Sequence, residues 1–133
     1  MKEENLCPCG SGKTYAVCCE PYHKQHNAPT AEALMRSRYS AFVFGLVDYL
    51  FATTHPNHRA KNLKADIAST CKGLAWTGLD VRDVWQGGEK DKVGKVTFHA
   101  SFVQEGKNGV HVEHSRFKRF GKAWMYVDGE VKG

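Results

Sequence analysis

The sequence predicts an α+β protein in which a cysteine-rich N-terminal segment precedes two helices and a four-stranded antiparallel meander. Three observations lead to this fold class. Four of the five cysteines lie between positions 7 and 19. Apolar residues recur every three or four positions from about 34 to 51, a spacing typical of a helix buried on one side. After Trp76 apolar and polar residues alternate, which is typical of strands.

Length and composition limit the class of protein. A chain of 133 residues with 41% hydrophobic and 25% charged residues is typical of a single folded soluble domain, and excludes disordered and collagen-like proteins. The most apolar stretch, residues 41–50, is too short to cross a bilayer. No charged, apolar and then small-residue leader opens the chain, so we expect a cytoplasmic protein with no membrane contact. The net charge of +5 permits binding to nucleic acid without requiring it.

The cysteine pattern indicates a metal site. A disulfide scaffold would distribute its cysteines along the chain, whereas here two thiols, an eight-residue excursion and two more thiols crowd one end. Four thiolates can surround one Zn²⁺ tetrahedrally, and a site closed by four protein ligands is structural because it has no open position for water. Bound Zn²⁺ would lower the net charge to about +3. The predicted ligands are Cys7, Cys9, Cys18 and Cys19.

The sequence leaves open both the identity of the metal and the fourth ligand. Iron bound by the same thiolates, or free redox-active cysteines, are the alternatives to zinc. His23 or His26 could also replace Cys19 as the fourth ligand, because spacing alone does not exclude either histidine.

Two helices are expected after the cysteines. Thr30 can cap a helix that follows Pro29, and the apolar spacing then predicts one long helix to about residue 51, ended by His55-Pro56. A shorter helix is predicted over residues 61–72. Cys71 lies on its apolar side, as a small core residue.

Four strands are expected over residues 79–85, 96–102, 110–120 and 123–131, with glycine-containing turns between them. A two-residue turn at Gly121-Lys122 pairs Phe120 with Ala123. Closing the preceding hairpin at residues 106–109 pairs Glu105 with Val110, which places Phe98 opposite Phe117 and Phe102 opposite Glu113. One face of the sheet then collects the aromatic side chains and packs against the long helix.

This register directs Glu113 and Ser115 into an aromatic surface, where a carboxylate needs a partner. We expect Arg36 or Arg38 to supply a counter-charge and Tyr39 a hydrogen bond. Two interpretations of Glu113 are open. Either it forms an ion pair that holds the helix against the sheet, or it lines a pocket in which it acts as an acid or base or anchors a polar ligand. The candidate pocket residues are Arg38, Tyr39, Phe102, Glu113, Ser115, Phe117, Trp124 and Tyr126.

Two motifs resemble known families. Residues 7–13, Cys-Pro-Cys-Gly-Ser-Gly-Lys, followed by Cys18-Cys19, resemble the SEC-C motif, a zinc-binding element found at the C-terminal end of the SecA translocation ATPase. Residues 28–41, together with 113–117 and 124–129, resemble the YchJ-like family of uncharacterised bacterial proteins. The resemblance implies a SEC-C zinc knuckle over residues 1–27 and an NTF2-like domain, a cone of sheet and helix, over residues 28–133.

The resemblance implies no reaction, and three functions remain in order of preference. The first is a binding module with a protein partner at the zinc knuckle, as in SecA-type proteins, where the similar motif contacts other proteins. The second is a small-molecule carrier or enzyme that uses the cone, and the third is nucleic-acid or ribosome binding. NTF2-like sheets also often form homodimers. Because the sequence has no nucleophile–base pair, Walker loop or dinucleotide fingerprint, it favours binding over catalysis, and we assign no catalytic residue.

Overall fold

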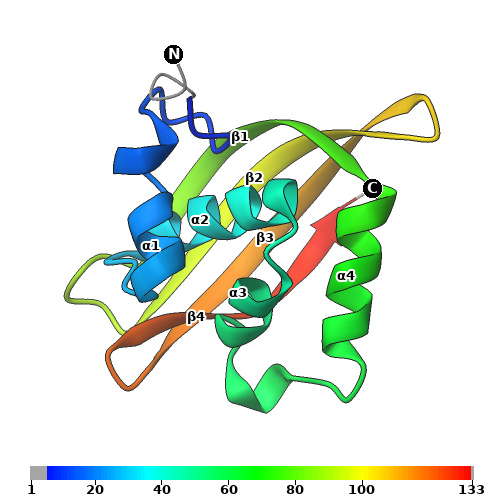
Figure 1. Cartoon of the computed structure of the whole chain (residues 1–133). Coiled ribbons are helices and arrows are strands. Elements are labelled where there is room, and N and C mark those ends of the chain that lie inside the picture. Colours follow the sequence, from blue (N-terminus) through cyan, green and yellow to red (C-terminus); the bar gives the residue numbers. More distant parts are fainter. Residues whose placement is uncertain (1–5, 133) are drawn as a thin grey trace.

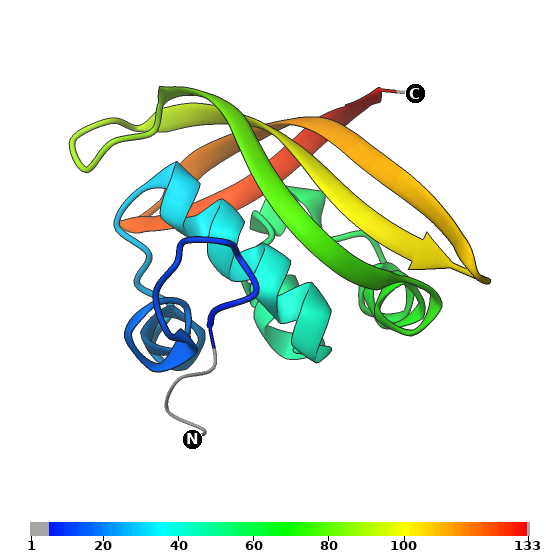
Figure 2. The same cartoon turned by 90° about the horizontal axis from the view of Figure 1, so that it is seen from above.

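The computed structural model describes residues 6–132 (Figure 1), so the first five residues of the predicted 1–27 segment lie outside the described part of the chain. Four antiparallel strands form a sheet in the order β1-β2-β3-β4, and the helices lie on one face of this curved sheet (Figure 2). The α+β prediction is confirmed. The short 3-10 helices are η2 (Tyr15–Val17) and η3 (Pro56–His58). The other elements are α1 (Glu20–Gln25), α2 (Ala31–Phe44), α3 (Val47–Ala52), α4 (Leu63–Gly73), β1 (Ala75–Gln86), β2 (Val93–Gln104), β3 (Lys107–Phe120) and β4 (Ala123–Lys132).

The predicted long helix is wrong as a single element, because it is divided into α2 and α3. Its start is confirmed: the Thr30 side chain accepts a hydrogen bond from the Ala33 N–H at 3.0 Å, as expected for an N-cap. The division occurs at Gly45, which ends α2 in the left-handed conformation with φ of 73°. Glycine adopts this conformation without a steric penalty. The chain therefore turns, and α3 begins two residues later in a new direction.

The strand register is confirmed at one hairpin and wrong at the other. Phe120 pairs with Ala123, as predicted. In the preceding hairpin the turn is Glu105-Gly106, with φ of 52° and 79°, so Phe98 faces Glu113 instead of Phe117. Positive φ at both central residues is the requirement of a two-residue turn of type I′. Because this error is an even number of residues, the side chains of β2 and β3 still lie on their predicted faces. A register shift between Arg116 and Phe117 then places Gly129, instead of Asp128, opposite Ser115.

The core consists of two clusters. The larger lies between α2 and the sheet and contains Phe98, Ala100, Phe117 and Trp124 from the predicted aromatic face. The smaller joins α2, α3 and α4, and Cys71 packs against it as predicted. Among residues 6–132 no helix combines the length and the apolar character needed to cross a bilayer.

Candidate functional site

The four N-terminal cysteines converge in space. A tight loop brings them together: the Cys7 N–H donates to the Lys13 carbonyl at 2.8 Å, and η2 then returns the chain to Cys18 and Cys19. The sulfur atoms of all four cysteines lie within 4.8 Å of one another. Cys7, Cys9 and Cys19 are buried, and Cys18 is partly buried.

This donor set fits a tetrahedral metal ion. The Cys9 and Cys18 sulfurs are 3.6 Å apart and the Cys18 and Cys19 sulfurs 4.0 Å apart, close to the edge of about 3.8 Å expected for a tetrahedron with Zn–S bonds of about 2.3 Å. Hydrogen bonds from Cys19 and Cys7 lower the pKa of Cys9, whereas the hydrogen bond with Cys7 raises the pKa of Cys19. Four sulfur atoms at these distances could surround one metal ion.

The histidines that were open as alternative ligands lie elsewhere. His23 Nδ1 is 2.7 Å from the Tyr15 hydroxyl and its Nε2 is 2.7 Å from the Ser37 carbonyl, so both ring nitrogens have partners. His26 is exposed and packs edge-on against Tyr49. The structure therefore groups the four cysteines without either histidine.

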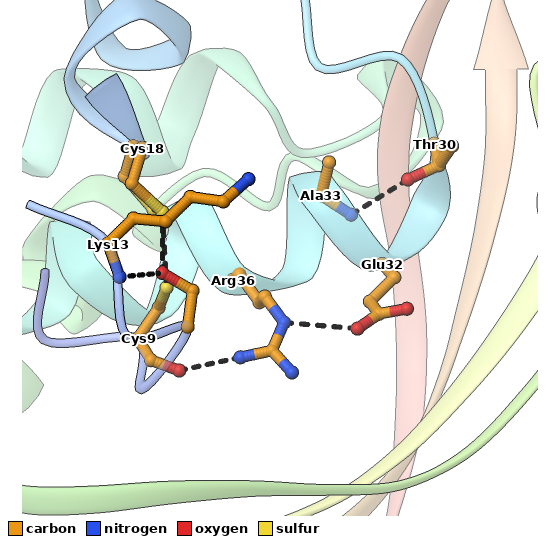
Figure 3. Close-up of polar contacts among 9 residues, drawn as sticks. Cys9, Lys13, Cys18, Thr30, Glu32, Ala33 and Arg36 are labelled. Atoms are coloured by element: carbon orange, nitrogen blue, oxygen red, sulfur yellow. Dashed lines mark hydrogen bonds and ion pairs between the residues drawn. The ribbon is translucent and has the colours of Figure 1, made fainter. Parts of the chain in front are cut away.

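The cysteine loop is joined to α2 by polar and apolar contacts. Arg36 on α2 reaches both Glu32, at 3.0 Å, and the Cys9 carbonyl, to which it donates at 2.7 Å (Figure 3). The Cys7 sulfur lies 3.3 Å from the Ser40 hydroxyl. Three of the four cysteines also belong to the larger core cluster. The cysteine cluster is thus built into the domain core.

A second feature is a cavity of about 740 Å³ between α2, α4 and the helix-covered face of the sheet. Phe102 and Trp124 do not line it. Phe102 packs against Trp76 with ring centroids 5.6 Å apart, and the Trp124 indole N–H donates to the Pro29 carbonyl at 3.1 Å. The structure places the other six predicted pocket residues in its wall: Arg38, Tyr39, Glu113, Ser115, Phe117 and Tyr126.

Glu113 is buried in the cavity wall and is fully hydrogen bonded. One carboxylate oxygen lies 2.8 Å from His111 Nε2, and the other accepts from the hydroxyls of Ser115 and Tyr126, both at 2.7 Å. Burial acts to raise the pKa of Glu113, but these three hydrogen bonds outweigh it and lower the pKa below its ordinary value. Gly129 on β4 makes room for the carboxylate, because a Cβ there would overlap it. Glu113 is therefore ionised, and is not suited to donate a proton as an acid.

The expected ion pair between Glu113 and an arginine is wrong. Arg36 pairs with Glu32. Among the described residues no carboxylate forms an ion pair with Arg38. Tyr126, and not Tyr39, supplies the tyrosine hydrogen bond to Glu113. The carboxylate has three hydrogen-bond partners on the sheet itself, His111, Ser115 and Tyr126. It therefore does not need an arginine from α2 as a counter-charge.

Several cavity residues were not predicted. His111 lies two positions before Glu113 on the same face of β3, and that spacing could have identified it. Trp76 lies at the start of β1, where the alternation begins. The α4 side chains that close the cavity, Leu63, Ile67 and Thr70, could not have been found, because nothing local in the sequence shows which element covers the sheet.

Comparisons with known proteins match both parts of the chain. The family described as "YchJ, middle NTF2-like domain" matches residues 30–129, and the SEC-C motif matches residues 5–21. The UPF0225 protein YchJ of Shigella dysenteriae serotype 1 (strain Sd197) is 44% identical over 126 residues, which cover 93% of this chain and 82% of that protein.

Two solved structures are similar over nearly the whole chain. The solution structure of a SEC-C motif containing protein from Rhodopseudomonas palustris is 34% identical, with a TM-score of 0.85, and the match covers 96% of this chain and 98% of that one. The crystal structure of a SEC-C motif containing protein from Psychrobacter arcticus is 28% identical, with a TM-score of 0.81, covering 99% and 85%.

Proposed function

This chain belongs to the YchJ family, and from that premise we propose that it is a small-molecule-binding protein whose fold is held at one end by a structural Zn²⁺. The observation that carries the proposal is the cavity of about 740 Å³ with two charged side chains, Arg38 and Glu113, buried in its wall. Ligand sites are generally concave and largely apolar, with a few placed polar groups, and measure roughly 300–1,000 Å³.

The cysteine cluster supports the structural role of the metal. Four protein ligands would fill the tetrahedral coordination of Zn²⁺ and leave no position for water or substrate. Zn²⁺ would supply the positive charge that holds four thiolates together. Because Cys7, Cys9 and Cys19 pack in the same cluster as α2 and the sheet, binding the ion would stabilise the whole domain. The cysteine cluster is therefore better suited to stabilise the fold than to act as a separate docking module. The protein partner expected at the zinc knuckle stays a prediction.

Elemental analysis of the full chain, purified without chelator, tests the metal. We expect about one zinc per chain in the unmodified protein and in Cys71→Ser, whose thiol lies outside the cluster, and loss of zinc in Cys9→Ser. Iron in place of zinc would contradict the identity of the metal. Absence of any metal would refute the site itself.

Titration with N-phenyl-1-naphthylamine, a neutral apolar fluorophore, tests the cavity. We expect saturable fluorescence enhancement, and weaker binding by about tenfold or more in Thr70→Trp, which fills the cavity from α4. Ser69→Trp is the matched control, because Ser69 is the exposed neighbour on the same helix and does not line the cavity. Equal binding by the two variants would refute the cavity as the site.

A further inference from the structure

Arg38 is a buried cation held in a fixed position. It is 9% exposed, and its Nη1 donates to the Leu50 carbonyl at 2.9 Å and to the Thr53 hydroxyl at 2.7 Å. Its guanidinium carbon lies 4.5 Å from the centre of the Tyr126 ring. These contacts come from the end of α3 and from β4, so the guanidinium cannot move away without losing them. Burial lowers the pKa of Arg38 to about 10, which leaves the side chain charged at neutral pH.

The opposite edge of the guanidinium is unused. Within residues 6–132 no hydrogen bond uses Nε or Nη2 of Arg38, since all of its bonds come from Nη1. Both nitrogens are also accessible to solvent. Among the described residues, the Trp76 indole nitrogen is the one side-chain polar atom that is buried and has no hydrogen-bond partner, so the unpaired Nε and Nη2 of Arg38 are not buried. Arg38 lines the cavity. The Nε–H and the adjacent Nη2–H thus form a fork without a protein acceptor among the described residues, on a side chain that lines the cavity.

Trp76 adds a second unpaired donor. Its ring lies in the cavity wall beside His111, with ring centroids 6.2 Å apart, and its buried N–H has no acceptor among the described residues. This nitrogen is sealed from solvent, so it does not bind a ligand in the cavity, and Trp76 contributes only its ring to the wall. Of the two unpaired donors, Arg38 is therefore the one that a ligand acceptor can reach.

Glu113, the other buried charged residue of the cavity wall, does not need a cation from the ligand. Both of its oxygens accept hydrogen bonds from protein donors, three in all. The other acidic residues of the wall are solvent-exposed Asp66 and Asp128, which is paired with Arg116. Glu113 acts on Arg38 through space, but among the described residues no carboxylate contacts the guanidinium as an ion pair, so the charge of the cavity without a contacting counter-ion is positive.

We propose that the cavity binds a small molecule with an apolar body and one carboxylate, and that Arg38 holds the carboxylate through its Nε and Nη2. This rests on the proposed function, that the cavity is a ligand site. The planar fork of a guanidinium matches the two oxygens of a carboxylate. Apolar side chains such as Met35, Phe42, Ile67 and Phe98 surround the remaining space and would contact the body of the ligand.

The experiment compares two probes of nearly the same shape, 4-phenylbutyrate and 4-phenylbutanamide, of which only the first has a charged headgroup with two acceptor oxygens. Each displaces N-phenyl-1-naphthylamine from the full zinc-loaded chain at pH 7. We expect the acid to bind at least about tenfold more tightly than the amide, as a charge-assisted pair implies. We also expect the acid, and not the amide, to shift the Arg38 Nε–H resonance in a ¹H–¹⁵N spectrum.

The matched variant is Arg38→Lys, which keeps the charge and removes the fork. We expect it to reduce the preference for the acid to threefold or less, on the order of the loss of one of two charge-assisted bonds. Trp76→Phe is the control, because it keeps an aromatic ring in the wall and removes an N–H that is sealed from solvent, so the preference for the acid should be unchanged. Equal loss of the preference in both variants would overturn the assignment to Arg38.

The outcomes separate the two proposals. If acid and amide bind equally while the fluorophore still binds, the carboxylate inference is overturned and the ligand cavity stands. If the acid is preferred but Arg38→Lys keeps the preference, the assignment to Arg38 is overturned. If neither the fluorophore nor either probe binds, the ligand-binding function itself is refuted.

Discussion

The hydrogen bond from Tyr126 to Glu113 leads to a quantitative prediction. The Tyr126 hydroxyl donates to the carboxylate at 2.7 Å, and the carboxylate is 8% exposed, so Tyr126→Phe leaves a buried charge with one donor fewer. A hydrogen bond to a charged group is worth about 1.5–3 kcal/mol, against about 0.5–1.5 kcal/mol for a neutral pair. We therefore expect Tyr126→Phe to lower the free energy of unfolding by about 2 kcal/mol.

Tyr49→Phe is the matched control. Its hydroxyl is also buried, and it lies 2.6 Å from the hydroxyl of Ser37, a neutral partner. We expect this variant to lower the free energy of unfolding by about 1 kcal/mol. Both variants keep the aromatic ring, so the difference between them isolates the charge of the acceptor.

Urea unfolding of the zinc-loaded protein at pH 7 measures both effects. With a slope of about 1–3 kcal/mol per molar urea, a difference of about 1 kcal/mol separates the two midpoints by roughly 0.3–1 M. Equal midpoints, or a smaller loss in Tyr126→Phe than in Tyr49→Phe, would show that Glu113 is not held as a buried carboxylate by this bond.

Three further predictions concern the same framework. Gly129→Ala should displace the Glu113 carboxylate and lower the free energy of unfolding by about 1–3 kcal/mol, whereas Gly78→Ala, with open space around its Cβ position, should change it by less than about 0.5 kcal/mol; equal losses in thermal unfolding would contradict this. Because the pKa of Glu113 is lowered in the folded state from its ordinary 4.5, the ionised carboxylate stabilises the protein above that pH, and the stabilisation is lost as the pH falls through the lowered value. The gap in urea-unfolding free energy between the unmodified protein and Glu113→Gln should thus shrink from pH 6 to pH 3.5, and a constant gap would contradict the shift. Thr30→Ala removes the cap of α2 and should cost about 1 kcal/mol of unfolding free energy by the same measurement, an expectation that an unchanged midpoint would overturn.

Much of the secondary structure could be predicted from local patterns. Thr30 marked the start of α2 because its hydroxyl satisfies a free N–H at the helix end. The alternation after Trp76 identified the strands, and the turn at Gly121-Lys122 set one register correctly. The break at Gly45 and the turn at Glu105-Gly106 were missed, because an apolar pattern continues across the first and several glycines compete for the second.

The candidate sites divide in the same way. The cysteine cluster lies within thirteen residues, so its spacing alone brought the ligands into reach of one another. The carboxylate at Glu113 was placed on the correct face because an even register error preserves the face. Its partners were assigned wrongly, because a pairing between helix and sheet depends on how each element is rotated and displaced.

The sequence by itself determined the features that depend on residues close together: the cysteine loop, the helix starts, the strands and the inward face of the sheet. Tertiary structure alone decided which groups contact the two buried charged side chains, Arg38 and Glu113. The turn at Gly45 carries α3 back along α2, which brings the Leu50 carbonyl and the Thr53 hydroxyl onto one edge of Arg38. Donors from the sheet satisfy Glu113 instead. A buried charge takes whichever partners packing brings within about 3 Å, and that distance is set by elements far apart in the chain.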